Sequence, residues 1–244
     1  MNIPWMQSAP QHWDIMRAKY MFEKQNRPIR DDEDVVTCFR DGMVTLRKNR
    51  RTTGFTESIQ WSGYQGVRKG DLVIHVMDAF AGAIGVSDSD GKSTPVYSVC
   101  TAKLDLNNHF YAYLLREMAR TGFIQSLYRG IRERSSDFRF EVFAGLYLPI
   151  PPREEQDQIV RYLDWKISQI NRFLVNVQGR TTIDPKLLEM YPRPLLGLLG
   201  EYRIKLISDV VTGKKDVRGV VIPNYKVANV DDYEAEELGD EYIQ

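Results

Sequence analysis

The sequence contains few of the residues from which disulfide frameworks, metal sites and membrane spans are built. Its 244 residues include two cysteines, Cys38 and Cys100, and three scattered histidines, His12, His75 and His109. Two cysteines cannot form a disulfide framework or a four-ligand zinc site, and we interpret both as small buried thiols of a reducing cytoplasm. The chain has no run of 18 apolar residues, and its N-terminus lacks the basic and apolar segments of a signal peptide. These absences predict a cytoplasmic protein with no membrane partner, no metal and no bound cofactor.

Catalytic signatures are missing as well. The stretch Gly85–Ser93 (GVSDSDGKS) resembles a phosphate loop, but that motif requires a glycine where the chain has Val86. The glutamate that would complete an EF-hand is replaced by Tyr97, so we interpret the stretch as a hairpin turn. Asp71 and Asp78 lack a third ligand, and we interpret them as structural. No GxSxG or HExxH pattern occurs, and the sequence therefore predicts no catalytic residues.

Positive and negative charges balance overall but are unevenly distributed. Residues 1–147 hold 20 Lys and Arg against 17 Asp and Glu, and residues 148–244 hold 13 against 16. The segment Asp231–Glu241 has seven acids and no base. This segment is typical of a solvated tail, and a docking tail is the alternative.

Residues 1–150 have the pattern of a mixed α/β domain. Short β-branched and aromatic runs bounded by turn residues predict strands. Apolar residues at helical spacing predict a helix over Phe110–Ile124, with Asn107 and Asn108 as candidate caps. The predicted strands are Asp71–Met77, Gly82–Val86, Pro95–Leu104 and Phe138–Leu148.

The residue composition changes sharply at Leu148–Val160 (LPIPPREEQDQIV), from prolines to acidic and amide residues. Prolines suit the first turn of a helix, and the acidic residues after them suit the positive end of its dipole. Apolar residues then recur at alternating steps of three and four, which is the a/d pattern of a coiled-coil seam. The seam residues are Val160, Leu163, Ile167, Ile170, Leu174 and Val177. We expect this seam to face a partner helix; an amphipathic helix packed on its own domain is the alternative.

The helical region is expected to be interrupted. The first helix is predicted over Pro152–Gln178, a break over Gly179–Pro194, and a second helix over Leu195–Thr212. The predicted fold class is α+β, a mixed α/β domain followed by long helices that form a coiled-coil-like region. The expected parts are residues 1–150, the helical spacer 151–213 and a C-terminal extension 214–244.

Two basic segments of the first domain, both expected to be irregular, are candidates for contact with nucleic acid. Arg40–Arg51 (RDGMVTLRKNRR) has five bases and one acid, and a second group of arginines lies within Tyr128–Phe140. Arginine suits phosphate oxygens and guanine edges, although a charge run can also be a solvated face. The candidate DNA contacts are Arg47, Lys48, Arg50, Arg51, Arg132 and Arg134.

Four stretches of the sequence carry motifs that are informative together. They are Ala9–Phe22 (APQHWDIMRAKYMF), Lys69–Val86 (KGDLVIHVMDAFAGAIGV), Leu148–Leu163 (LPIPPREEQDQIVRYL) and Glu201–Arg218 (EYRIKLISDVVTGKKDVR). Together they resemble the specificity (S) subunits of type I restriction–modification enzymes. In this order, they resemble the opening of that family, the core of its target-recognition domain, its proline-rich exit and its closing helix.

The resemblance implies a non-catalytic subunit that reads half of a split DNA sequence. Its implied partners are double-stranded DNA, methyltransferase (M) subunits and the restriction and translocation (R) subunit. A full-length member has two recognition domains, whereas this chain has one, which implies a homodimer or pairing with a second half-subunit. The resemblance also implies that Gly70, Asp71, Gly82 and Gly85 are motif positions, which we interpret as structural. The alternatives are a free-standing DNA-binding regulator, an antagonist that caps the methyltransferase and, less favoured, an enzyme in its own right.

Overall fold

The chain divides into two compact units, each of which is described by itself. The structure, a computed structural model, describes residues 5–6, 9–50, 63–127, 138–183 and 193–225, and of residues 175–183 and 193–196 only the backbone. The globular unit comprises Met1–Asp157 with Val211–Lys215, and the helical unit comprises Gln158–Val210 with Asp216–Gln244. The predicted boundaries after residues 150 and 213 stay predictions.

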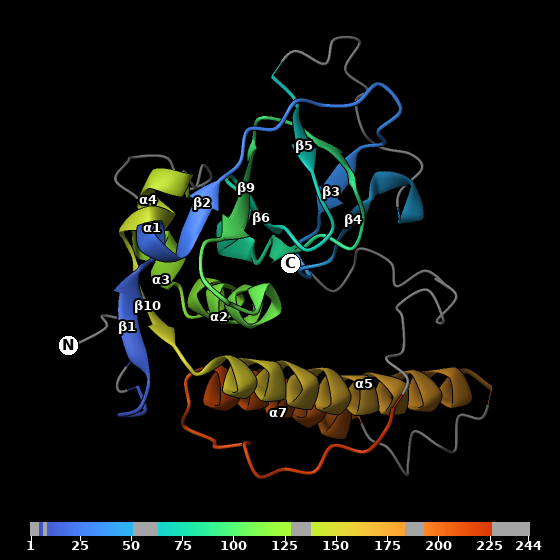
Figure 1. The fold of residues 1–244 in the computed structure, drawn as a ribbon. Helices are drawn as coiled ribbons and strands as arrows, with labels where there is room; N and C mark the ends of the chain where they lie inside the picture. Colours follow the sequence, from blue (N-terminus) through green and yellow to red (C-terminus); the bar gives the residue numbers. More distant parts are fainter. Residues whose placement is uncertain (1–4, 7–8, 51–62, 128–137, 184–192, 226–244) are drawn as a thin grey trace. The chain divides into compact units, whose positions relative to one another are not determined.

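The globular unit is built from short strands and helices (Figure 1). Its strands are β1 (Asp14–Arg17), β2 (Phe22–Lys24), β3 (Val36–Cys38), β4 (Val44–Leu46), β5 (Gln65–Val67), β6 (Leu72–His75), β7 (Ile84–Val86), β8 (Gly91–Ser93), β9 (Tyr97–Ala102) and β10 (Tyr147–Ile150). Its helices are α1 (Ala18–Met21), α2 (Asn108–Arg120), α3 (Phe123–Ser126) and α4 (Phe140–Gly145), with the 3-10 turns η1 (Arg47–Asn49) and η2 (Ala79–Ala81).

The strands form one four-stranded sheet and three two-stranded sheets. The larger sheet has the order β2-β9-β6-β7, and the smaller ones pair β1 with β10, β3 with β4 and β5 with β8. The neighbouring strands within these sheets are antiparallel. Isolated bridges such as Val44 to Ser87 and Val35 to Lys92 connect the smaller sheets to their neighbours. The β1–β10 pair joins segments that are far apart in the sequence, because β1 lies near the N-terminus and β10 follows α4.

Two apolar clusters stabilise the globular unit. Side chains alternate between the faces of a strand, so Val73 of β6 faces away from its neighbours Leu72 and Ile74. Val73 lies in a buried cluster that includes residues of β3, β4, β5 and β9. A second, aromatic group joins β2 to two helices: the Phe22 ring lies 5.2 Å from that of Tyr111 on α2 and 5.5 Å from that of Phe143 on α4.

Several predicted elements are confirmed, and two expectations are wrong. Strands occur as β6, β7 and β9 where the sequence predicts them, and α2 begins after the predicted cap Asn107, whose side chain accepts a hydrogen bond from the His109 N–H. The predicted strand Phe138–Leu148 is instead α4 followed by β10. The predicted hairpin turn within Gly85–Ser93 is also wrong, because β7 pairs with β6 whereas β8 pairs with β5.

The helical unit contains most of α5 (Arg153–Ile183) and α7 (Arg193–Val211), which pack together (Figure 1). The Arg203 guanidinium of α7 donates to the Asn171 side chain of α5 at 3.0 Å. The segment after residue 215 lies along α5, where the Gln158 amide donates to the carbonyls of Val217 at 3.0 Å and Val220 at 2.7 Å. The predicted fold class, α+β with a mixed α/β domain followed by long helices, is thus confirmed.

The helix α5 passes through the expected interruption at Gly179. It ends at Ile183, so its 31 residues span about 46 Å. A single glycine inside a helix costs only about 1 kcal/mol, which a long packed helix tolerates. The second helix begins with Pro194 in its first turn, where the missing proline N–H is harmless. The rest of the expected break, residues 184–192, lies outside the described residues. Across the described part of the chain, no helix combines the length and the apolar character needed to cross a membrane.

Candidate nucleic-acid interface

The first predicted basic segment forms a hairpin instead of an irregular loop. Strands β3 and β4 pair from Val36 opposite Leu46 to Cys38 opposite Val44, and the 3-10 turn η1 follows directly. At the tip, the Phe39 N–H donates to the Met43 carbonyl at 2.8 Å. The predicted contacts Arg47 and Lys48 therefore lie on η1, beyond the second strand. The Arg47 N–H donates to the Val35 carbonyl at 2.7 Å, which holds the start of η1 beside the first strand.

The predicted cations of this hairpin hold polar partners. The Lys48 ammonium lies 2.6 Å from a carboxylate oxygen of Asp34, and the Arg50 guanidinium lies 2.6 Å from one of Asp41. The Arg50 guanidinium also stacks over the Phe39 ring at 4.5 Å. Exposed ion pairs of this kind are weak, so a DNA phosphate can compete for these cations.

The remaining predicted contacts are differently placed. The Arg47 guanidinium donates to the Thr37 hydroxyl at 3.3 Å and is half-buried. Arg51, Arg132 and Arg134 lie outside the described residues. As DNA contacts, all six residues stay predictions.

Two described residues that follow gaps in the description, Gly63 and Phe138, are connected through one line of contacts. Gly63 lies against Pro95: an added Cβ at Gly63 would be 3.0 Å from the proline Cγ. The carbonyl of the next residue, Val96, accepts a hydrogen bond from the Val76 N–H at 3.0 Å, and the Val76 carbonyl accepts one from the Phe138 N–H at 3.3 Å. These contacts lie at the end of β6 and the start of β9.

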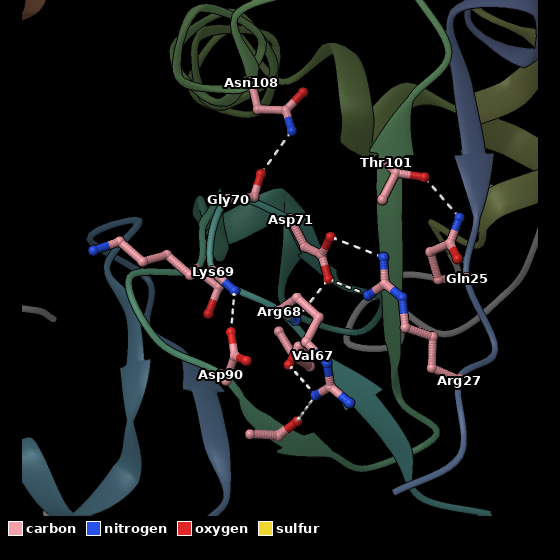
Figure 2. A network of polar contacts seen from close by, with 12 residues as sticks. Gln25, Arg27, Val67, Arg68, Lys69, Gly70, Asp71, Asp90, Thr101 and Asn108 are labelled. Carbon is pink, nitrogen blue, oxygen red and sulfur yellow. Dashed lines mark hydrogen bonds and ion pairs between the residues drawn. The ribbon is translucent and has the colours of Figure 1, made fainter.

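The KGD motif of the resemblance builds a buried polar node (Figure 2). The Asp71 carboxylate is buried and accepts two hydrogen bonds from the Arg27 guanidinium, at 2.5 and 3.2 Å. It also accepts the Arg68 backbone N–H at 2.7 Å, which closes the turn that leads into β6. A buried carboxylate needs such partners, because an unpaired buried charge is strongly unfavourable.

The rest of the motif fixes this turn to its surroundings. Gly70 has a φ of 91°, which favours glycine, and its carbonyl accepts the Asn108 side-chain amide at 2.7 Å. The Lys69 N–H donates to Asp90 at 2.9 Å. The node therefore connects the start of β6 to the first turn of α2, and these contacts are structural.

Glycines allow the β3–β4 hairpin to approach β7 unusually closely. A Cβ added at Gly85 of β7 would lie 2.0 Å from the Gly42 carbonyl oxygen, and one at Gly82 would lie 2.8 Å from the Arg40 carbonyl oxygen. Gly42 itself, with a φ of 89°, faces the Arg116 guanidinium. The backbone of the hairpin tip is thus held against the sheet by contacts that no larger residue permits.

Burial shifts the pKa values of several titratable groups in the globular unit. Burial raises the pKa of the Cys38 and Cys100 thiols far above their ordinary value, so both are protonated at neutral pH and neither is a nucleophile. Burial also raises the pKa of Tyr97 to about 12. It lowers the pKa of His75, whose Nδ1 accepts the Asp78 N–H at 3.0 Å. The His75 imidazole is therefore neutral at pH 7, where it serves as a hydrogen-bonding group.

The EEQD motif at the start of α5 is a second polar node. The Glu155 carboxylate accepts the Trp13 indole N–H at 3.1 Å and lies 2.8 Å from the His12 Nε2. The Gln156 side chain accepts the Asn107 N–H at 2.8 Å and donates to the Pro151 carbonyl at 2.8 Å. These contacts lie inside the globular unit, and they bind the first turn of α5 to the N-terminal PQHW stretch and to the cap of α2.

The predicted seam residues are buried to different degrees along α5. Val160, Leu163 and Ile170 are buried, whereas Ile167 and Leu174 are half-buried. Of Val177 the structure describes only the backbone. The function of this face as a seam stays a prediction.

Sequence reasoning missed two features of this interface. Arg40 lies inside the basic segment but was not singled out; it is paired with Asp78 at 3.0 Å. The sequence predicts that the acids of the EEQD motif stabilise the helix dipole. It does not predict the contact of Glu155 with Trp13 or that of Gln156 with Asn107. The available signal was the co-occurrence of the PQHW and EEQ motifs in one family pattern.

Comparisons with known proteins give structural matches alone. No family model and no curated protein matches the chain. A chain of the type I R-M system, in a structure of its complex assembly and conformational transition, matches with a TM-score of 0.41 and 16% identity, over 85% of this chain and 48% of that one. The HsdS subunit from Thermoanaerobacter tengcongensis matches with a TM-score of 0.40 and 15% identity, over 85% and 47%. The type I restriction–modification S subunit from M. genitalium matches with a TM-score of 0.42 and 16% identity, over 84% and 51%.

The chain spans about half the length of these solved chains. The family that its sequence motifs resemble is the family to which two of these chains belong. The structural matches of this chain are thus to type I restriction–modification systems and their S subunits, over about half of their length.

Proposed function

We propose that the chain is a sequence-specific DNA-recognition subunit of a type I restriction–modification system. The globular unit reads one half of a split site, and the helical unit docks methyltransferase subunits. The chain itself is non-catalytic, and it works in the cytoplasm together with the M subunits and the R subunit. The other half of the site is read by a second copy or a second half-subunit, and a two-fold symmetric pair reads a palindromic split site.

The strongest support comes from the positions of the motifs that carry the family resemblance. KGD supplies the buried Asp71 node, and EEQ supplies the Glu155–Gln156 node. Motif residues with such structural roles explain why the pattern recurs in a family whose members read different DNA sequences. The residues that would contact DNA are different ones, namely the exposed cations of the hairpin and the arginines within Tyr128–Phe140.

Co-expression with a type I methyltransferase subunit from the same cell tests the proposal. We expect a stable complex that methylates adenine in a bipartite site, and no methylation or cleavage by the purified chain alone. Methylation or cleavage by the chain alone would show an enzyme. A chain that binds DNA but forms no complex would be a free-standing regulator, and a complex that suppresses methylation would be an antagonist.

Mass measurement during size-exclusion chromatography tests the pairing. We expect the chain, or its complex with the methyltransferase, to contain two copies. A strict monomer in both conditions would contradict the half-subunit proposal.

The predicted DNA contacts are tested by the double variant Arg50→Ala, Arg51→Ala. Each lost phosphate contact reduces the slope of log affinity against log salt by about 0.9, so we expect weaker duplex binding with a shallower salt dependence. An unchanged slope would remove these two residues from the interface.

A further inference from the structure

The exposed cations of the β3–β4 hairpin are each matched with one carboxylate. Arg40 lies 3.0 Å from Asp78, Arg50 lies 2.6 Å from Asp41, and Lys48 lies 2.6 Å from Asp34. The side chains of Arg40 and Lys48 are 65% and 64% exposed, and that of Arg50 is 27% exposed. These three cations are therefore already paired with carboxylates.

These cations stand on a backbone that cannot easily move. The carbonyls of Arg40 and Gly42 lie against Gly82 and Gly85, where an added Cβ would be 2.8 and 2.0 Å away. The tip is closed further by the Met43 N–H, which donates to the Asp41 carboxylate at 3.0 Å. Since the backbone is fixed, an incoming ligand can rearrange side chains here but not the hairpin.

A phosphate and a carboxylate compete for the same guanidinium geometry. Exposed ion pairs contribute little stability because water screens them, whereas a DNA phosphate that binds a cation also releases condensed counterions. The exchange of carboxylate for phosphate is therefore possible, but each exchange costs the protein one existing pair and leaves a carboxylate close to the DNA.

We propose that Asp34, Asp41 and Asp78 restrain sequence-independent DNA binding by occupying the hairpin cations, and that Arg40 is a further phosphate-binding residue. A contact with phosphate alone adds little binding free energy, because each cation must first release its carboxylate. Binding then depends on a duplex that also supplies base contacts. This inference rests on the proposed function, because it assumes that the hairpin meets DNA.

Asp41→Asn is the sharpest variant. Asparagine keeps the side-chain oxygen that accepts the Met43 N–H and removes the charge that holds Arg50. Asp78→Asn releases Arg40, although Asp78 also lies 3.6 Å from His75 Nδ1. The matched control is Asp14→Asn, which makes the same charge change on an exposed residue of β1.

The affinity of the full chain for a short mixed-sequence DNA duplex is measured by fluorescence anisotropy over a range of salt concentrations. Each of Asp41→Asn and Asp78→Asn should raise affinity roughly three- to tenfold at low salt and steepen the salt slope by about 0.9, the value for one additional phosphate contact. The Asp14→Asn control should change neither by as much. Removal of the released cation, in Asp41→Asn with Arg50→Ala and in Asp78→Asn with Arg40→Ala, should abolish the gain.

The outcomes separate this inference from the function on which it rests. If the wild-type chain binds the duplex but the hairpin variants behave like Asp14→Asn, the restraint by carboxylates is wrong and the DNA-recognition proposal stands. If neither the wild type nor any variant binds the duplex at low salt, the proposed function fails as well. A gain that survives removal of Arg40 or Arg50 would show a general charge effect and would also overturn the inference.

Discussion

Two glycines of the globular unit and two of the helical unit stand in opposite surroundings. In the globular unit, Gly82 and Gly85 lie so close to the backbone of the β3–β4 hairpin that no Cβ fits. In α7 of the helical unit, a Cβ added at Gly197 or Gly200 would meet no described atom within 4 Å outside its own stretch of helix. The contact between the hairpin and β7 is therefore sensitive to single atoms, whereas the described part of α7 accepts additional ones. A surface that must present side chains in fixed positions needs the first kind of packing.

The polar contacts differ in the same way. The globular unit buries the carboxylates of Asp71 and Glu155 and satisfies them with side chains distant in the sequence. The described contacts of the helical unit are more exposed, such as the Arg218–Asp216 pair, or lie along α5, such as those of Gln158. We expect substitutions in the first unit to be costly and matched ones in the second to be mild.

The largest effect is expected for Gly85→Ala. The new Cβ would collide with the Gly42 carbonyl, and because backbone cannot move aside without cost, we expect a loss of about 2–3 kcal/mol of unfolding free energy. Urea denaturation followed by tryptophan fluorescence measures it. The matched change Gly197→Ala in the helical unit should instead stabilise by about 0.5–1 kcal/mol. Equal effects at the two positions would contradict the comparison.

Asp71→Asn should cost somewhat less. The substitution keeps the shape of the side chain but removes the charge that holds Arg27, and we expect a loss of about 2 kcal/mol because Arg27 is partly exposed. Chemical denaturation of the full chain provides the measurement. Asp216→Asn, in an exposed pair of the helical unit, should stay within about 0.5 kcal/mol of the wild type. A neutral Asp71→Asn would show that the KGD node contributes no stability.

Gln158→Ala tests the attachment of the C-terminal segment to α5. The substitution removes two hydrogen bonds to the Val217 and Val220 carbonyls, and we expect a local loss of about 1 kcal/mol. Hydrogen exchange should become faster over residues 216–225. Gln169 lies on the same helix, and its side-chain oxygen accepts a hydrogen bond from the neighbouring Lys166 at 3.3 Å. Gln169→Ala should leave that exchange unchanged.

The smallest effect is a pH dependence centred on His75. Burial lowers the pKa of this imidazole in the folded chain, so the unfolded chain takes up the proton first and stability is lost as the pH falls below about 6.5. Between about pH 7.5 and 5.5, the wild type should lose roughly 1 kcal/mol or less beyond what His75→Asn loses. Thermal melting at the two pH values measures the difference, and parallel losses would exclude His75 as the cause.

Elements set by local pattern are predictable from the sequence. The β-branched run of β6 and the spacing of α2 with its Asn107 cap predict those elements correctly, and the a/d spacing predicts α5. The strand predicted over Phe138–Leu148 is wrong, although its apolar residues alternate as in a strand. Phe143 interrupts that alternation, and on α4 its buried ring packs against the rings of Phe22 and Phe138. Tertiary packing overrides the local pattern there.

Pairing over long distances cannot be read from local signals. No periodicity indicates that β1 pairs with β10 or that β7 and β8 belong to different sheets. The same reason explains the site: the basic segment is visible in the sequence, but the carboxylates that neutralise it include Asp34 and Asp78, which only the fold brings beside Lys48 and Arg40.

The fixed backbone of the β3–β4 hairpin matters for protein engineering and for the evolution of new binding surfaces. Because Gly82 and Gly85 constrain the backbone carbonyls of Arg40 and Gly42, the exposed side chain at position 40 can be exchanged without a new scaffold, and so can that at position 41 where the new side chain still accepts the Met43 N–H. A library that varies position 40 freely and position 41 among such acceptors, with Gly82–Gly85 unchanged, would keep one architecture while it varies the surface that it presents. Related chains could alter what they bind by the same route, one exposed side chain at a time.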